Sequence, residues 1–456
     1  MNRTSPRALA VVCFSAGTLA YEILLVRVFA IQHFHHFAYM AIGVAMLGFG
    51  VSGTALALAR PRDAQSRARW FFSASIATTV ALVLSPMLVH QISLDPTQLA
   101  WDLGEWVRLA VVYVLLALPF AAGALAILLA LTLEPERPGW IYGASFIGSG
   151  LGAGLTIMVL WLLTPVSALA APAVAAGLGS MAAAHGSRRR TRAYALAALA
   201  FLISIVPLVH PPWRLTLTPY KALPQVGAFP AARRVAERSS PIGWVTAVSA
   251  PAFRYAPGLS LGFRGELPPQ TGLFVDGQLA GAATKWGDKR AAKAMLDWLP
   301  TALPYVLGQR NQVLVVGGGS GIEVANALAH GARRVTAMEL DPHLVELAQE
   351  FGTLPSGSPA DSVTWVLGDA RHHVARSRDR FDLITLGPGG AIGAGAAGVH
   401  ALGEDFLHTR EAYAEYLDRL AEGGVLSITG WVSVPPRANV RVMLTAVDAL
   451  RRVAPH

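Results

Sequence analysis

The chain has 456 residues and a formal net charge of +9; 53% of its residues are hydrophobic and only 14% are charged. About a quarter of the residues of a typical soluble domain are charged, so this composition excludes an ordinary soluble protein. The single cysteine, Cys13, excludes an intrachain disulfide framework. No recognisable nucleic-acid-binding module accompanies the positive charge. We therefore expect basic loops against anionic lipid and no nucleic-acid partner.

Apolar runs long enough to span a bilayer occupy the first half of the chain. The first run is not a cleavable signal peptide, because it is long, carries Glu22 and Arg27 and is followed at once by another run. We predict a polytopic α-helical membrane domain of six to eight spans over residues 1–210, with the lipid bilayer as its partner. The runs fall near residues 8–31, 35–59, 70–90, 107–133, 140–163, 166–184 and 193–210.

Small and ionisable residues stand out within these runs. Gly148 and Gly152, and the glycines of segment 43–50, have the spacing of closely packed membrane helices. Glu22 and Arg27 either form a substrate or proton site or pair with neighbouring helices. Three histidines follow the first run, but no cysteine or carboxylate set nearby completes a metal site, so we predict none. They are His33, His35 and His36.

Residues 211–300 are predicted to form a linker and a small β subdomain. The proline-rich stretch 211–230, bounded by Trp213 and Tyr220, is the best domain boundary. The alternating sequences WVTAVSA and GLFVDGQ that follow predict short antiparallel strands.

Residues 301–456 begin with a βαβ pattern around a glycine loop. An apolar strand at 313–316 leads into the loop, a helix-like segment follows, and a second strand ends on Glu339. Glycines let the backbone approach a ligand at a helix N-terminus, where free N–H groups favour negative charge. An acid about 20 residues later is placed to accept ribose hydroxyls. The pattern predicts a Rossmann-like domain that binds a nucleoside cofactor; a degenerate scaffold is the alternative. The loop glycines are Gly317, Gly318, Gly319 and Gly321.

The loop lacks the G-x-G-x-x-G spacing of dinucleotide-binding proteins. It is followed by LGDAR, by the apolar strand FDLITL and by GGVLSITGW. This series resembles a class I S-adenosylmethionine-binding fold. The resemblance implies that Glu339 binds the ribose, that Asp369 and Ala370 bind the adenine, and that the glycine loop binds the methionine part.

Further segments narrow the resemblance. LTPYK, LFVDGQ, the glycine loop, MELD, GDA and the segment 406–429 are similar, in this order, to the spermidine synthase family of polyamine aminopropyltransferases. The similarity covers roughly residues 215–445. Fusion to a hydrophobic N-terminal half resembles the membrane-bound, spermidine synthase-like proteins of bacteria. The resemblance implies a transferase that uses S-adenosylmethionine or its decarboxylated form and a small-molecule acceptor.

The chain also departs from that family at three places. Glycines, Gly387 and Gly390, stand where the family has two acids after the fourth strand, and Ser320 replaces the acid of the glycine loop. A Tyr-His-Glu cluster expected after DGQ is absent. Binding a polycation requires carboxylates to offset its desolvation. We therefore expect a non-polyamine or membrane-associated acceptor instead of ordinary spermidine synthesis.

A glycine- and alanine-rich segment, 387–405, replaces the missing acids. Its candidate catalytic residues are His400, which could act as a base near neutral pH, and Glu404 and Asp405. The alternative is that His400 is a surface histidine and that the two acids complement the dipole of a helix beginning near Phe406.

The distribution of charge predicts the orientation of the spans. Arg3, Arg7 and the segments 60–69 and 187–192 are basic, whereas the loop 91–105 is acidic, so we expect a cytoplasmic N-terminus. Seven crossings would then put the C-terminal domain outside, away from its cofactor. Either one run, 166–184 or 193–210, does not fully cross, or the predicted orientation is reversed. Because the cofactor is expected in the cytoplasm, we place the C-terminal domain on the cytoplasmic side of a bacterial inner membrane.

The chain stops after a helix-like segment at 437–452, where a complete fold of this class adds an antiparallel hairpin. We expect either a truncated reading frame or a partner subunit that covers the exposed sheet edge. A second function therefore stays open: a non-catalytic membrane subunit whose Rossmann domain serves ligand sensing or assembly.

Overall fold

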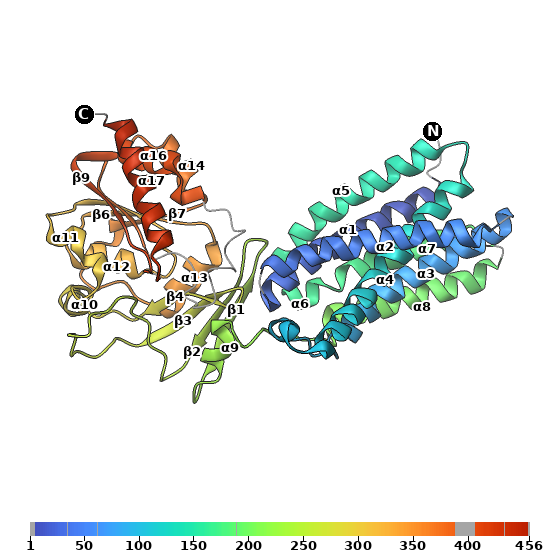
Figure 1. Cartoon of the computed structure of the whole chain (residues 1–456), viewed down its shortest axis with the longest axis horizontal. Helices are drawn as coiled ribbons and strands as arrows, with labels where there is room; N and C mark the ends of the chain where they lie inside the picture. The colour runs from blue at the N-terminus through green and yellow to red at the C-terminus, as the bar shows by residue number, and fades with distance from the viewer. Residues whose placement is uncertain are drawn as a thin grey trace. The chain divides into compact units, whose positions relative to one another are not determined.

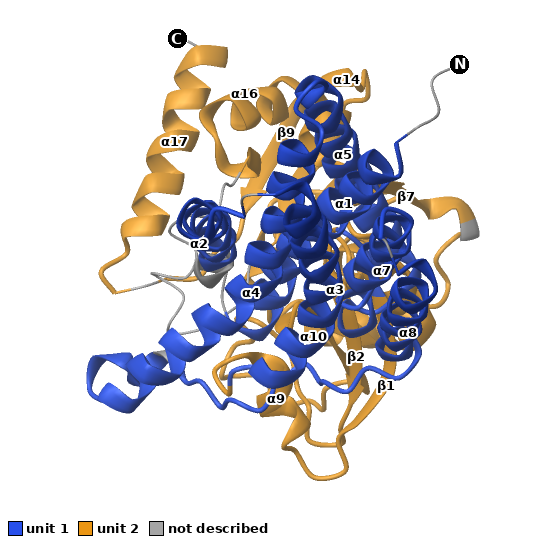
Figure 2. Cartoon of the chain, turned by 90° about the vertical axis from the view of Figure 1, so that its right-hand side faces the viewer, with its two compact units in different colours: residues 1–218, 239–241 blue, residues 219–238, 242–456 orange. Residues whose placement is uncertain are grey.

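The structure is a computed structural model that describes residues 5–33, 35–61, 63–187, 189–387, 406–432 and 434–454. It divides into two compact units, coloured separately in Figure 2. The first comprises residues 1–218 with 239–241, and the second comprises residues 219–238 with 242–456.

Helices occupy all seven predicted apolar runs of the first unit (Figure 1). Seven helical segments of the described chain are long and apolar enough to cross a membrane, with α6 and α7 counted as one segment. The run predicted as a single span at 166–184 is broken into these two helices by a turn. The helices are α1 (Pro6–Gln32), α2 (His35–Ala59), α3 (Ala64–Val89), α4 (Leu103–Leu133), α5 (Pro138–Leu162), α6 (Pro165–Ala168), α7 (Ala171–Ala184) and α8 (Arg190–Val209), with a 3-10 turn η1 (Pro96–Ala100) before α4.

Helix α1 is central and packs against α2, α4, α5 and α7. A Cβ atom at Gly148 would lie 2.3 Å from the carbonyl oxygen of Val12, and one at Gly152 would lie 2.3 Å from that of Ala16. Neither position can hold a larger residue without moving the two helices apart. The close packing predicted for this glycine pair is confirmed.

The glycines of segment 43–50 on α2 behave differently from one another. A Cβ at Gly48 would lie 2.5 Å from the Cβ of Phe120 on α4, so close packing occurs here. A Cβ at Gly43 would make only an ordinary contact, and one at Gly50 would meet nothing within 4 Å. The prediction for this segment was wrong at Gly50, because that residue does not face α4.

The two ends of this helical unit are distinguished by their contacts. Near the start of α1, Arg7 forms an ion pair of 3.5 Å with Glu134, which follows α4. At the other end of α1, the carbonyl oxygen of Gln32 accepts a hydrogen bond of 2.8 Å from the N–H of Thr218. The chain therefore leaves the first unit at the end opposite its N-terminus.

The second unit begins with α9 (Ala222–Gly227) and a four-stranded sheet in the order β1-β2-β3-β4. Strands β2–β3 and β3–β4 pair antiparallel, which confirms the predicted short strands. The two-residue turn between β3 and β4, Asp276 and Gly277, has positive φ at both positions, as tight hairpins require. The strands are β1 (Arg233–Ser239), β2 (Trp244–Ser249), β3 (Gln270–Val275) and β4 (Gln278–Thr284).

A five-stranded parallel sheet follows in the order β7-β6-β5-β8-β9. This is the predicted Rossmann-like domain, and its strand order reverses at β5. Its strands are β5 (Gln312–Val316), β6 (Arg334–Glu339), β7 (Val363–Leu367), β8 (Phe381–Leu386) and β9 (Leu420–Ile428). The helices are α10 (Lys289–Leu296), α11 (Leu303–Val306), α12 (Ile322–Ala329), α13 (Pro342–Phe351), α14 (Ala370–Arg376), α16 (Arg410–Asp418) and α17 (Arg437–Val453).

Side chains of β5 are buried on both faces, as expected for a central parallel strand. Leu314 and Val316 belong to the core formed with α14, α16 and α17, whereas Val313 and Val315 belong to the core formed with α12. The edge strands of the sheet are β7 and β9, and the chain described after β9 forms helix α17.

Candidate functional site

A cavity of about 330 Å³ lies where β5, β6 and β8 end. Ligands of doubly wound sheets bind in this position, at the carboxyl ends of the strands beside the point where the order reverses. The volume falls in the range of small-molecule sites, about 300–1,000 Å³. The lining residues are Tyr255, Pro257, Val275, Gln278, Leu279, Ala280, Val316, Gly317, Gly319, Ser320, Ile322, Glu323, Glu339, Leu344, Leu386, Gly387, Leu407 and His408.

The N–H groups of the glycine loop are used within the protein. Those of Gly317 and Gly318 both donate to the carbonyl oxygen of Met338 at 3.0 Å, and that of Gly321 donates to the carbonyl of Gly318 at 2.8 Å. The N–H of Gly319 donates to Glu339 at 3.1 Å. The N–H groups of these four glycines are therefore not free, and the expectation for the N–H groups at the N-terminus of α12, which begins at Ile322, stays a prediction.

Glu339 lies at the end of β6, lines the cavity and is held by the backbone. Its Oε2 accepts the hydrogen bond from Gly319, and its Oε1 accepts bonds of 2.8 and 3.2 Å from the N–H groups of Leu340 and Asp341. Burial raises its pKa, and these hydrogen bonds offset part of the rise. A Cβ at Gly319 would lie 2.6 Å from Oε2, so only glycine admits this contact. Its role in binding ribose stays a prediction.

The two residues predicted to bind adenine do not line this cavity. Asp369 is exposed, and its Oδ1 accepts a hydrogen bond of 2.7 Å from the N–H of His372, which caps α14. Ala370 is buried against the core beneath α14. The structure gives Asp369 a capping role, and adenine binding stays a prediction.

The predicted catalytic residues His400, Glu404 and Asp405 lie outside the described residues. The helix expected to begin near Phe406 starts as a 3-10 turn, Phe406–His408, and α16 begins at Arg410. The hydroxyl of Thr409 accepts a hydrogen bond of 3.1 Å from the N–H of Ala412. Thr409 therefore caps α16. The alternative prediction had assigned the start of this helix to Glu404 and Asp405.

Sequence reasoning missed Glu323 as a site residue. It lies in the first turn of α12, lines the cavity and is only 5% exposed. An acid among apolar residues directly after the glycine loop was the available signal. Together with Glu339 it gives the described lining two carboxylates, one histidine, His408, and no lysine or arginine. The cavity therefore favours a cation.

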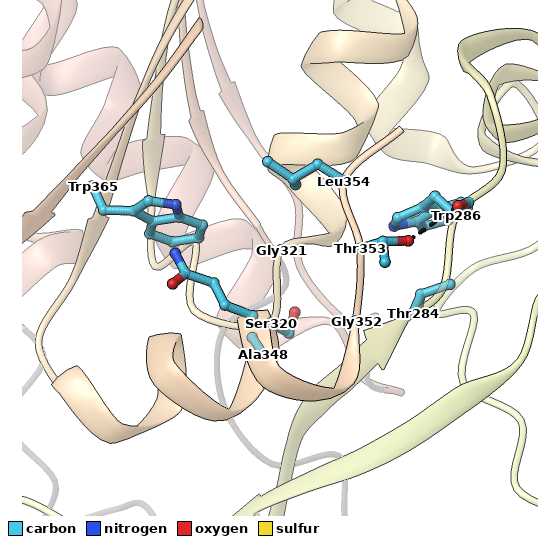
Figure 3. A pocket seen from close by; sticks show the side chains of 10 residues that line it. Thr284, Trp286, Ser320, Gly321, Ala348, Gly352, Thr353, Leu354 and Trp365 are labelled. Carbon is cyan, nitrogen blue, oxygen red and sulfur yellow. Dashed lines mark hydrogen bonds between the residues drawn. The ribbon is translucent and has the colours of Figure 1, made fainter. Parts of the chain in front are cut away.

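A second, smaller pocket of about 120 Å³ shares Ser320 with the cavity. Figure 3 shows the indole rings of Trp365 and Trp286 on opposite sides of it, with Ser320 and Ala348 between them. The hydroxyl of Thr353 donates to the carbonyl oxygen of Trp286 at 3.0 Å. This volume is too small for a nucleoside, so the larger cavity is the candidate site.

Metal binding has no candidate among the described side chains, where no three His, Cys, Asp or Glu residues are grouped to hold an ion. No protein-family model matches the chain.

Curated relatives of the chain are polyamine aminopropyltransferases. The chain is 33% identical to polyamine aminopropyltransferase 2 of Hyperthermus butylicus over 22% of this chain and 35% of that protein. It is 30% identical to polyamine aminopropyltransferase 2 of Streptomyces coelicolor over 40% of this chain and 30% of that protein. For polyamine aminopropyltransferase 1 of Pseudomonas aeruginosa the identity is 27% over 31% of this chain and 48% of that protein. The chain spans less than half the length of these relatives.

Among solved structures, the spermidine synthase of Thermotoga maritima aligns at 19% identity, over 49% of this chain and 63% of that one, with a TM-score of 0.31. A spermidine synthase in complex with the transition-state analogue AdoDATO aligns with the same values. The sequence relatives support the predicted resemblance to aminopropyltransferases, but they do not test the predicted resemblance to a membrane-bound subgroup. The chain shows weak homology to the polyamine aminopropyltransferases.

Proposed function

We propose that the second unit binds a positively charged nucleoside sulfonium, decarboxylated S-adenosylmethionine or S-adenosylmethionine, and transfers an alkyl group from it to a small acceptor. The observation that carries this proposal is the cavity at the ends of β5, β6 and β8, with two carboxylates and no lysine or arginine in its described lining. The weak similarity to aminopropyltransferases supports the same class of substrate.

The charge of the cavity distinguishes this substrate from a dinucleotide. Two carboxylates in a partly buried site attract a sulfonium and repel a pyrophosphate, since charges interact strongly where water is scarce. The N–H groups of Gly317, Gly318, Gly319 and Gly321 are already bonded within the protein and offer no cradle for phosphate. Glu339, at the end of β6, is the carboxylate proposed to accept the ribose hydroxyls.

The reaction we propose needs orientation more than acid–base help. A lone pair on the acceptor attacks the carbon bonded to the sulfonium sulfur, and the carbon–sulfur bond breaks with its electron pair going to sulfur. A neutral thioether leaves, and the proton that the acceptor loses passes to water or to a nearby base. The positive charge on sulfur disappears in this step.

We propose an acceptor other than a polyamine, because Ser320 and Gly387 stand at cavity positions where the resemblance predicts acids. A chain with several ammonium groups would need more carboxylates than this lining offers. Seven helices with the length and composition of membrane spans support an acceptor that reaches the site from the bilayer. We also propose that the second unit faces the cytoplasm, where the sulfonium nucleoside is made.

Calorimetry on the purified full-length chain tests the proposal. We expect binding of decarboxylated S-adenosylmethionine or S-adenosylmethionine and no binding of NAD. Glu339→Gln should weaken sulfonium binding at least about tenfold, equal to about 1.4 kcal/mol, because it removes charge-assisted hydrogen bonds to the ribose. Glu422→Gln, at an exposed acid of β9, is the matched control and should leave binding unchanged. Failure of every sulfonium nucleoside to bind would overturn the proposal.

A further inference from the structure

Glu323 is a buried carboxylate whose hydrogen bonding within the protein is incomplete. Its side chain is 5% exposed and lines the cavity, and its Oε2 has no hydrogen-bond partner among the described residues. Its polar neighbours are the side chains of Asn326 and Thr301, and the amide of Asn326 donates a hydrogen bond of 3.1 Å to the hydroxyl of Thr301. Leaving a buried charged oxygen unmatched is costly, so structural stability does not explain an acid at this position.

Glu323 also stands beside the place of a missing acid. A Cβ atom at Gly387 would lie 3.3 Å from Cγ, 3.9 Å from Cδ and 4.0 Å from Oε1 of Glu323. The resemblance to aminopropyltransferases predicts an acid at this end of β8. The carboxylate of Glu323, projecting from α12, therefore fills the space that an acidic side chain at position 387 would enter, and the glycine leaves room for it.

We propose that Glu323 binds a substrate's primary ammonium group in this cavity, replacing the acids that are absent at positions 320 and 387. This inference rests on the proposed function and adds to it a preference for substrates that carry a primary ammonium group. If the ammonium belongs to the aminopropyl chain of the sulfonium nucleoside, Glu323 favours the decarboxylated form. The carboxylate of S-adenosylmethionine would otherwise lie close to a buried carboxylate and be repelled.

The surroundings of Glu323 suit a cation that arrives with the substrate. The residues that act on it electrostatically or by hydrogen bonding are Tyr255, Tyr305, Asn326 and Thr301, none of which carries a positive charge. Burial raises the pKa of Glu323 to about 7. An ammonium within hydrogen-bond distance would stabilise the ionised form and lower that pKa.

Two substrates could supply the ammonium: the sulfonium nucleoside through its aminopropyl chain, or an amine acceptor. Both would use the same charge-assisted hydrogen bond to the carboxylate. With Glu339 occupied by ribose, Glu323 can neutralise one ammonium, which is the number present in decarboxylated S-adenosylmethionine. We therefore expect the nucleoside to be the source.

Calorimetry with two nucleosides separates the ammonium from the rest of the ligand. Decarboxylated S-adenosylmethionine carries the ammonium, whereas 5′-dimethylsulfonio-5′-deoxyadenosine has the same adenosine and the same sulfonium charge without it. Glu323→Gln should weaken binding of the first at least about tenfold and change binding of the second by less than twofold. Glu339→Gln should weaken both. A second variant, Glu323→Gln with Gly387→Asp, returns an acid to the same space from β8 and should recover part of the lost affinity.

The outcomes distinguish the two proposals. If Glu323→Gln weakens both nucleosides equally, or neither, the nucleoside is not the source of the ammonium, and a monoamine, butylamine, is then titrated with 5′-methylthioadenosine bound. A loss of butylamine binding in Glu323→Gln would support Glu323 as the site of an acceptor's ammonium. No binding of butylamine to the unaltered chain, or equal affinity in both proteins, would overturn the inference and leave the proposed function intact. If neither nucleoside binds the unaltered chain, the proposed function itself fails.

Discussion

At the scale of single residues, the site contains two acids held in different ways. Glu339 accepts three backbone hydrogen bonds, whereas Glu323 lines the cavity and has one buried oxygen, Oε2, that is unmatched among the described residues. The first arrangement fixes the direction of a carboxylate. The second leaves hydrogen-bonding capacity for a ligand, and it lowers the stability of the protein when no ligand is present.

Burial of the Glu323 carboxylate predicts that the stability of the folded protein depends on pH. Its pKa in the folded protein, about 7, lies above its ordinary value of 4.5, so the folded state holds the proton more tightly than the unfolded state. The associated stability is fully present below pH 4.5 and is lost as the pH rises through 7. The rise of this pKa from 4.5 to about 7 lowers the free energy of unfolding by about 3 kcal/mol at high pH, relative to low pH.

Glu323→Gln removes this titration without removing the side chain. The variant and the unaltered chain should therefore have similar thermal midpoints near pH 4.5, and the variant should become increasingly the more stable of the two between pH 5 and 8. Thermal unfolding of both proteins at several pH values measures the difference, with Glu422→Gln as the comparison. A constant difference across the range would contradict a raised pKa for Glu323. Tyr255 and Tyr305, which interact with Glu323, carry no charge change in this range.

The sequence predicted one of the two acids because of how each is encoded. Glu339 ends a strand about 20 residues after a glycine loop, so local pattern alone predicts its position. The importance of Glu323 depends on residues far from it in the chain, such as Thr301 beside its carboxylate and Gly387 against its side chain. Hydrogen bonding of the loop could not be foreseen either, because Met338 reaches Gly317 and Gly318 only in the folded sheet.

At the scale of elements, apolar runs and strand patterns predicted most helices and strands, because a segment buried on one face or on both carries its own periodicity. The break between α6 and α7 was not predicted, although Pro172, in the first turn of α7, is a residue type typical of a helix start. Which glycines contact a neighbouring helix was predicted only in part. Gly48 and Gly50 are only two residues apart, yet only Gly48 packs against α4.

Helix α5 offers a test of close packing with an internal control. A Cβ at Gly152 would lie 2.3 Å from the carbonyl oxygen of Ala16 on α1, whereas one at Gly154 would meet nothing within 4 Å. Gly152→Ala should therefore destabilise the chain by roughly 1–3 kcal/mol through overpacking. Gly154→Ala should be neutral or slightly stabilising, because alanine favours helix formation. Thermal unfolding of the two variants should rank them in this order; equal midpoints would contradict close packing of α1 and α5.

At the scale of the whole molecule, the two ends of the helical unit determine on which side of a membrane the chain would begin and leave it. Arg7 and Glu134 mark the end at which the chain begins, and Thr218 leaves at the other end beside Gln32. If all helical segments cross, residues 7 and 218 lie on opposite sides of the membrane. A cytoplasmic N-terminus and a cytoplasmic second unit, both expected from the sequence, then cannot hold together.

Cysteine labelling resolves the conflict because Cys13 is the single cysteine of the chain. With Cys13→Ala as background, Glu422→Cys reports on the second unit and Ser187→Cys reports on the turn between α7 and α8. The proposed function predicts that a membrane-impermeant thiol reagent reaches Glu422→Cys only after the cell membrane is opened. Labelling of that variant in intact cells would place the second unit outside and contradict the use of a cytoplasmic sulfonium nucleoside.

The central position of α1 also has a consequence for how the protein is made. In a membrane-inserted bundle, α1 is synthesised first, but two of its partners, α5 and α7, begin at residues 138 and 171. At about 5–20 residues per second, α1 waits roughly 5–30 seconds for them. During that time Glu22 and Arg27 lack the surroundings of the finished bundle. If the helices are inserted one by one, we expect the first helix to need retention near its partners until the fifth and seventh helices emerge.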